Sequence, residues 1–164
     1  MNFIEIPKVE LHIHLDCSLS FDVVKKINPN ITKPQFIDQF IGIKCNSLKD
    51  YIKCADRAVE LMQTKKELEL VTSDLFKQLK EDNVIYAEIR FAPLLHLDKG
   101  LSSHEVVKII SQITKKESSK TGIDAGLILC TLRHYSEQQS METVNLANDF
   151  KGSNVIGFDL AADE

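Results

Sequence analysis

The chain has 164 residues, of which 43% are hydrophobic and 27% charged, enough for one domain with a buried core. Its formal net charge of -4 and its scattered lysines provide no basic stripe, which argues against a nucleic-acid partner. No run reaches the roughly 18–20 apolar residues of a membrane span. The four cysteines form no C-x-x-C pair and the amino terminus lacks a signal-peptide pattern, so we expect a cytoplasmic protein with reduced thiols.

Strand-like and helix-like patterns alternate along the chain. Period-two alternation and short apolar runs indicate strands, whereas apolar residues at helical spacing behind a capping residue indicate helices. In chain order, these patterns predict a strand over Lys8–Leu15, a short helix capped by Ser20, a helix over Lys33–Phe40, a helix opened by Ser47, a long helix opened by Thr64, a strand over Val84–Phe91, a helix over Glu105–Lys120, a strand over Ala125–Leu132, a helix over Met141–Phe150 and a strand over Val155–Leu160.

This order predicts an α/β fold with about four parallel strands joined by crossover helices. The carboxyl ends of parallel strands meet on one face, where a (β/α)8 barrel carries its active site. Polar residues stand near that end of every predicted strand: His12, His14, Glu88, Arg90, Arg133, His134 and Asp159. We expect Glu88 and Arg90, which share a face by parity, to form an interior ion pair. The remaining histidines, His96 and His104, are predicted to be solvated.

The first predicted strand carries His12 and His14 one residue apart. In an extended strand, positions i and i+2 point to the same face, so the two imidazoles project side by side and are able to chelate a divalent metal. By the same alternation Glu10 shares their face. The alternative is a pair of surface histidines on a half-exposed strand. Asp16, two positions after His14, favours the metal site.

Four segments resemble the adenosine deaminase family of metal-dependent amidohydrolases, in the order of that family. They are PKVELHIHLD (7–16), YAEIRFAP (86–93), ILCTLRH (128–134) and FDLAADE (158–164). The resemblance spans nearly the whole chain and implies a TIM-like (β/α)8 barrel with one catalytic zinc ion. It also implies hydrolytic deamination of a purine nucleoside, adenosine to inosine and ammonia, in purine salvage.

The resemblance assigns His12 and His14 as zinc ligands, and His14, Asp16 and Ala162 to the substrate. Asp16 matches an aspartate that hydrogen-bonds a ribose hydroxyl, and Ala162 stands where the family has a glycine whose backbone N–H donates to purine N3. Cys17 also replaces a family glycine. A glycine at 17 would suit a turn with positive φ, and a methyl group at 162 would crowd the purine or alter the backbone. Cys17 is not expected to be a ligand, because the two histidines and more distant ligands suffice.

The resemblance places the remaining zinc ligands and the catalytic acid and base in later strands, and the H-A-G-E segment of the family is absent here. We therefore expect residues 1–164 to be a single partial domain, the amino-terminal half of a barrel that needs the missing carboxyl-terminal half. No catalytic residue is assigned within this chain, and residues 1–164 alone are predicted to be inactive. Two alternatives stay open: a deaminase of adenine, AMP or a modified nucleoside, and a non-catalytic half barrel that binds a metal or a partner chain.

Overall fold

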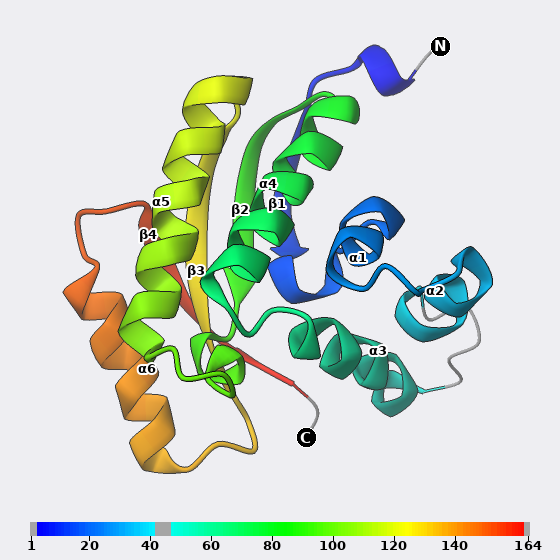
Figure 1. Ribbon diagram of the computed structural model, residues 1–164. Helices are drawn as coiled ribbons and strands as arrows, with labels where there is room; N and C mark the ends of the chain where they lie inside the picture. Colours follow the sequence, from blue (N-terminus) through cyan, green and yellow to red (C-terminus); the bar gives the residue numbers. More distant parts are fainter. Residues whose placement is uncertain (1–2, 42–46, 163–164) are drawn as a thin grey trace.

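A single parallel sheet organises the chain. The computed structural model describes residues 3–41 and 47–162. Its strands are β1 (Lys8–His14), β2 (Val84–Phe91), β3 (Asp124–Leu132) and β4 (Val155–Ala161). They lie in the order β1-β2-β3-β4, and every neighbouring pair is parallel (Figure 1). The predicted α/β fold with four parallel strands is confirmed.

Helices occupy every connection between the strands. Their bounds are α1 (Phe21–Ile27), α2 (Lys33–Phe40), α3 (Leu48–Glu60), α4 (Lys65–Glu81), α5 (Ser103–Thr121) and α6 (Glu137–Asp149), with short 3-10 turns η1 (Phe3–Glu5), η2 (Leu15–Cys17) and η3 (Pro93–His96). No helix within the described ranges has the length and apolar character needed to cross a membrane.

Side-chain caps fix where most helices begin. Ser20, Thr32 and Thr64 accept hydrogen bonds from the backbone three residues later, as the sequence predicts. Helix α6 begins four residues earlier than predicted, because Ser136 and Gln139 form a reciprocal capping box. These caps satisfy backbone N–H groups that a helix start leaves without partners.

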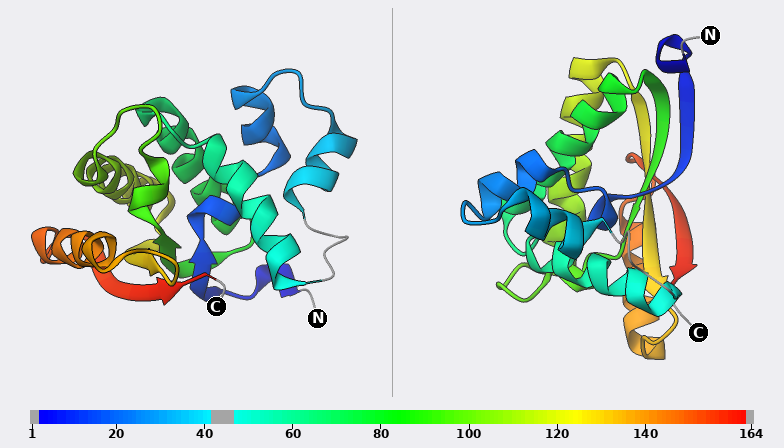
Figure 2. Two further views of the ribbon diagram at one scale, coloured as in Figure 1. Left: turned by 90° about the horizontal axis from the view of Figure 1, so that it is seen from below. Right: turned by 90° about the vertical axis from the view of Figure 1, so that its right-hand side faces the viewer.

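The helices pack on one side of the sheet, and within the described residues none covers the opposite side (Figure 2). The largest fully buried side chains come from the strands and from the helices facing them, and include Phe76, Ile89, Phe91, Ile110, Leu127 and Leu129. Strand β3 is buried at every position after Asp124, including positions on the side that no described helix covers, because β2 and β4 flank it on both edges. Helices cover the other side of the sheet, so a site would lie on the side that they leave open or at the ends of the strands.

A bulge interrupts β1 in the stretch that contains Leu11 and His12. The pairing shifts between Glu10, which faces Ala87, and Ile13, which faces Ile89. Paired residues of neighbouring parallel strands point to the same face, so Glu10 lies with Ala87 on the helix side of the sheet. The prediction that Glu10 shares a face with the two histidines is therefore wrong. Its carboxylate instead accepts a hydrogen bond from the His12 backbone N–H at 3.3 Å.

Helix α3 closes one end of the molecule. In both Figure 1 and Figure 2 it lies beyond the carboxyl ends of β1 and β2, next to the chain end of β4. Turn η2 continues directly from β1 and packs against α3, and η3 continues from β2. The carboxyl ends of the strands, two 3-10 turns and one helix therefore surround the same space.

Candidate metal and nucleoside site

A pocket of about 690 Å³ opens at the carboxyl ends of the strands. All four residues that the sequence assigns to the metal or the substrate line this pocket: His12, His14, Asp16 and Ala162. Helix α3 contributes Ile52, Ala55, Asp56 and Val59 to its wall. The pocket is large enough for a small organic molecule and combines apolar walls with a few convergent polar groups.

The imidazoles of His12 and His14 lie side by side, as the i, i+2 spacing predicts. Their Nε2 atoms are 3.3 Å apart, and their ring centroids are 5.3 Å apart. Two nitrogen ligands on a tetrahedral zinc ion, each bonded at roughly 2.0–2.1 Å, would be about 3.3–3.4 Å from each other. The two nitrogens therefore have the separation of two adjacent ligands, and the residues present fit half of a zinc coordination shell.

Arg90 holds the His12 ring from the next strand. Its Nη1 lies 2.9 Å from His12 Nε2 and 2.8 Å from Asp159 Oδ2. A guanidinium can only donate, so His12 Nε2 accepts and the ring proton resides on Nδ1. In that tautomer Nε2 carries the lone pair that a metal ligand needs, and Arg90 occupies this lone pair in the absence of a metal.

The predicted ion pair between Glu88 and Arg90 is wrong. Glu88 accepts a hydrogen bond from the Tyr86 hydroxyl at 3.0 Å, whereas Arg90 forms its ion pair with Asp159 on β4. Asp159 pairs in register with Cys130 on β3. The ion pair therefore reaches from β2 across β3 to β4, and through His12 it connects the ends of β1, β2 and β4. This network fixes the imidazole orientation through residues far apart in the sequence.

Asp16 is buried beneath the second imidazole. Its Oδ1 lies 3.7 Å from His14 Nδ1 and accepts a hydrogen bond from the Cys17 thiol at 3.7 Å. A carboxylate next to Nδ1 favours the tautomer that carries the proton there and leaves Nε2 free for a metal. Asp16 thus has the position to orient His14 and also to face a ligand in the pocket.

Cys17 contributes a third atom to a compact group: one ligand atom each from His14, Asp16 and Cys17 lie within 4.8 Å of one another. Burial, and then the neighbouring Asp16 carboxylate, raise the pKa of the Cys17 thiol above its ordinary value. In addition, residue 17 does not need the backbone of a glycine, because it lies in the 3-10 turn η2 and is not among the described residues with positive φ.

Ala162 differs from Cys17 in this respect. Its φ is 77°, in the left-handed region that L side chains rarely adopt. The residue therefore keeps the backbone conformation that a glycine would take, with a methyl group added at the rim of the pocket. Asp163 and Glu164, which complete the last motif, lie outside the described residues, as does Cys45.

The prediction that His96 is solvated is wrong. The side chain is fully buried, its Nδ1 donates to the carbonyl oxygen of Met62 at 3.1 Å, and its Nε2 has no partner among the described residues. Burial lowers the pKa of His96 below the ordinary value. The sequence signal for this burial is the apolar turn that Pro93 opens directly after β2. His104 is exposed, as predicted, with its ring 4.8 Å from that of Phe150.

A parallel sheet with paired imidazoles at its carboxyl edge is the arrangement expected of half a TIM-type barrel, whose site lies at the carboxyl ends of the strands. The family model for adenosine deaminase matches residues 7–164, and the chain belongs to that family. An adenosine deaminase of Clostridium perfringens is 36% identical over 172 residues, an alignment that covers 100% of this chain and 52% of that relative.

Two solved structures show the same fold. An adenine deaminase from Arthrobacter aurescens has a TM-score of 0.81 and 18% identity, over 96% of this chain and 49% of that one. The Arabidopsis N6-mAMP deaminase MAPDA has a TM-score of 0.79 and 25% identity, over 97% of this chain and 51% of that one. The chain spans about half the length of these proteins and corresponds to the amino-terminal half of a TIM-like barrel.

Proposed function

We propose that residues 1–164 form the metal-binding and substrate-binding half of a zinc-dependent adenosine deaminase, which hydrolyses adenosine to inosine and ammonia in purine salvage in the cytoplasm. The 3.3 Å separation of His12 Nε2 and His14 Nε2, at the carboxyl edge of the sheet, is the observation that supports this proposal most directly. The family to which the chain belongs supports the same reaction class.

The residues at the carboxyl edge of the sheet have separate roles in the proposed reaction. His12 and His14 would hold the zinc ion, and Arg90 with Asp159 keeps the His12 ring in place. When bound, zinc would lower the pKa of a water molecule toward roughly 7 and so supply a nucleophile at neutral pH. Water adds at purine C6 and ammonia leaves.

Substrate contacts are assigned to the other side of the pocket. Asp16 and His14 lie next to each other and are proposed to bind the ribose hydroxyl. Ala162, at the end of β4, is proposed to donate its backbone N–H to purine N3. The acid and base that move protons during the reaction are not assigned to this half.

Zinc binding and activity are tested together on a longer product in which residues 1–164 are joined to a carboxyl-terminal half of the barrel. We expect this longer chain to contain zinc and to convert adenosine to inosine, measured as a change in ultraviolet absorbance. His12→Ala or His14→Ala should lose zinc and activity together, whereas Asp16→Ala should mainly raise KM. The exposed His104 provides the control, because His104→Ala should retain both zinc and activity.

The need for the carboxyl-terminal half is tested with residues 1–164 alone. Residues 1–164 alone should show no turnover, because half of the coordination shell and the proton-transferring groups are expected elsewhere. Turnover by this fragment would contradict the proposal. Zinc retained at full occupancy by His12→Ala would equally contradict the assignment of the imidazole pair.

Two other functions have support. The solved structures with the same fold include an adenine deaminase and an N6-mAMP deaminase, which favours comparing adenine, AMP and N6-methyl-AMP as substrates in the same assay. The uncovered side of the sheet is compatible with a non-catalytic half barrel that binds a metal or a partner chain. A stop codon after Glu164 with no complementing reading frame would favour that last possibility.

A further inference from the structure

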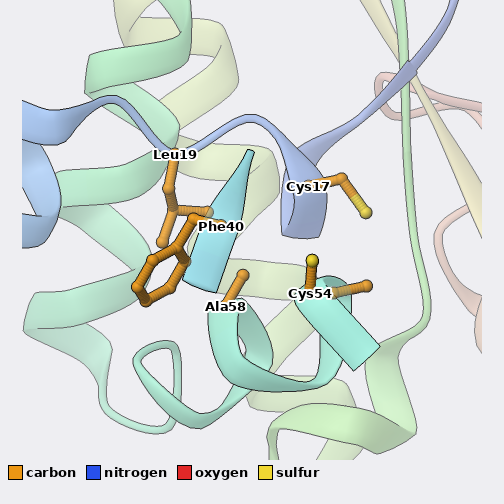
Figure 3. A pocket seen from close by; sticks show the side chains of 6 residues that line it. Cys17, Leu19, Phe40, Cys54 and Ala58 are labelled. Carbon is orange, nitrogen blue, oxygen red and sulfur yellow. The ribbon is translucent and has the colours of Figure 1, made fainter. Parts of the chain in front are cut away.

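A second, much smaller cavity lies between η2 and α3. Its volume is about 10 Å³, which is at most the space of one water molecule. Two sulfur atoms reach this gap from opposite sides, Cys17 from η2 and Cys54 from α3 (Figure 3). The remaining wall is apolar and comes mainly from Leu19, Phe40 and Ala58.

Both cysteines are free thiols and both are partly exposed. They differ in this from Cys130, which is a free thiol buried in the sheet. The two residues line the same small cavity although they are distant in the sequence, and the packing of η2 against α3 brings their two segments together. A reagent that reaches one thiol would therefore find the second within the same gap.

We propose that Cys17 and Cys54 form a modification site, a thiol pair that a small-molecule disulfide such as oxidised glutathione converts to an intramolecular disulfide. The Cys54 thiolate attacks the reagent first, because burial and the Asp16 carboxylate disfavour the thiolate of Cys17. It breaks the S–S bond of the reagent and releases one reduced thiol. The other cysteine then attacks the resulting mixed disulfide and displaces the second reduced thiol. The two protein thiols lose two hydrogen atoms and two electrons in total, and the reagent gains them.

The bond would join two walls of the larger pocket. Asp16 and Cys17 line the large pocket from η2, and Ala55 and Asp56, which follow Cys54, line it from α3. Oxidation would therefore fix the distance between η2 and α3 at the side of the pocket that the imidazoles occupy. The modification itself does not depend on the proposed deaminase activity.

The test uses residues 1–164 equilibrated with mixtures of reduced and oxidised glutathione, alkylated and digested, with peptides identified by mass spectrometry. We expect a peptide linking Cys17 to Cys54 with the loss of two hydrogen atoms. A thiol held at high effective concentration outcompetes one elsewhere in the molecule, so this peptide should exceed any peptide linked through Cys130, which is buried in the sheet, by about tenfold. Cys45→Ser should leave the Cys17–Cys54 link unchanged.

The conservative variant Cys17→Ser provides the matched control. It should retain glutathione on Cys54 as a mixed disulfide, because no second thiol remains in the gap to displace it. Glutathione attached to Cys17 and Cys54 in the same molecule, without a link between them, would overturn the proposal. A predominant Cys17–Cys45 link would overturn it as well.

Discussion

Ala162 has a backbone conformation that glycine adopts more readily than alanine. With φ at 77°, its Cβ approaches the following carbonyl oxygen at a cost of roughly 1–2 kcal/mol. Glycine would remove this cost, but its greater conformational freedom would also stabilise the unfolded chain by about 0.4–1 kcal/mol. Ala162→Gly should therefore raise the free energy of unfolding by about 0.5–1 kcal/mol, measured by urea denaturation.

The neighbouring residue distinguishes a conformational effect from a general effect of glycine. Ala161 is the last residue of β4 and has no positive φ, so Ala161→Gly should destabilise the chain by roughly 0.5–1 kcal/mol. Two changes of the same sign would contradict the role assigned to the backbone of residue 162.

His96 should make stability depend on pH. Its buried ring stays neutral when folded, because burial lowers its pKa below the ordinary value of 6.5, whereas the unfolded chain takes up a proton below that pH. The unfolded state then binds more protons, so the contribution is fully present above pH 6.5 and is lost as pH falls below it, by up to about 1.4 kcal/mol per pH unit.

The variant His96→Asn isolates this contribution. The amide retains a donor for the Met62 carbonyl but does not titrate, so between roughly pH 5 and 7 its unfolding free energy should fall less steeply than that of the parent. The absolute stability should be lower by about 1–3 kcal/mol because the smaller side chain leaves a void. His104→Asn, at an exposed position, should retain the parent slope; an unchanged slope in His96→Asn would contradict the burial argument.

Local spacing predicted the imidazole pair but not the residues that orient it. The i, i+2 relation of His12 and His14 survives the bulge in β1, whereas the position of Glu10 does not. The Arg90–Asp159 contact joins residues 69 positions apart, and no local pattern identifies such a partner. For His96, the apolar turn opened by Pro93 signals that the segment is buried, but which side chain of η3 faces inward depends on how the turn packs.

At the level of elements, the start of α6 depends on Ser136. Its hydroxyl oxygen accepts from the Gln139 N–H at 3.3 Å, and the Gln139 side chain accepts from the Ser136 N–H at 3.0 Å. Ser136→Ala should lower the free energy of unfolding by about 1 kcal/mol, measured by chemical denaturation, because it leaves a helix-start N–H without its partner. Ser119→Ala, at an exposed interior position of α5, should change it by less than about 0.5 kcal/mol. Equal effects at the two serines would contradict the capping role.

The strands and most helices were predictable because their signals are local. Apolar runs gave all four strands to within one residue at each end, and capping residues gave the starts of α1, α2 and α4. The start of α6 was predicted too late because its first turn, Glu137–Ser140, is polar throughout and carries no apolar periodicity. The bulge in β1 has no such local signal, because it depends on the pairing with β2.

At the scale of the whole molecule, the chain exposes apolar surface and two free strand edges. Phe158 and Leu160 on β4 are 45% and 48% exposed, and they pair with helix-side residues Leu129 and Thr131. Surfaces of this kind promote association. Residues 1–164 should therefore self-associate with rising concentration and enhance the fluorescence of a hydrophobic dye.

The double change Phe158→Lys and Leu160→Lys should lower the dye signal several-fold and shift sedimentation toward the monomer. Gln138→Lys, an exposed position on α6, adds charge without removing apolar surface and should alter neither measurement. Association that persists equally in the double variant would show that β4 is not the responsible surface. The half-barrel architecture itself was predictable from the order of elements and the family motifs, since parallel strands require long crossovers.

The contact between Arg90 and His12 makes cation entry an exchange reaction. The nitrogen that a cation would take already accepts from a guanidinium 2.9 Å away, and Asp159 retains that guanidinium on its other side. A cation that binds between the imidazoles must displace the positively charged Arg90 guanidinium, which Asp159 keeps close to the site. Arg90 therefore orients the His12 ring but lowers the affinity of the site for the cation. Its replacement by a neutral residue should raise that affinity and make the orientation of the His12 ring less fixed.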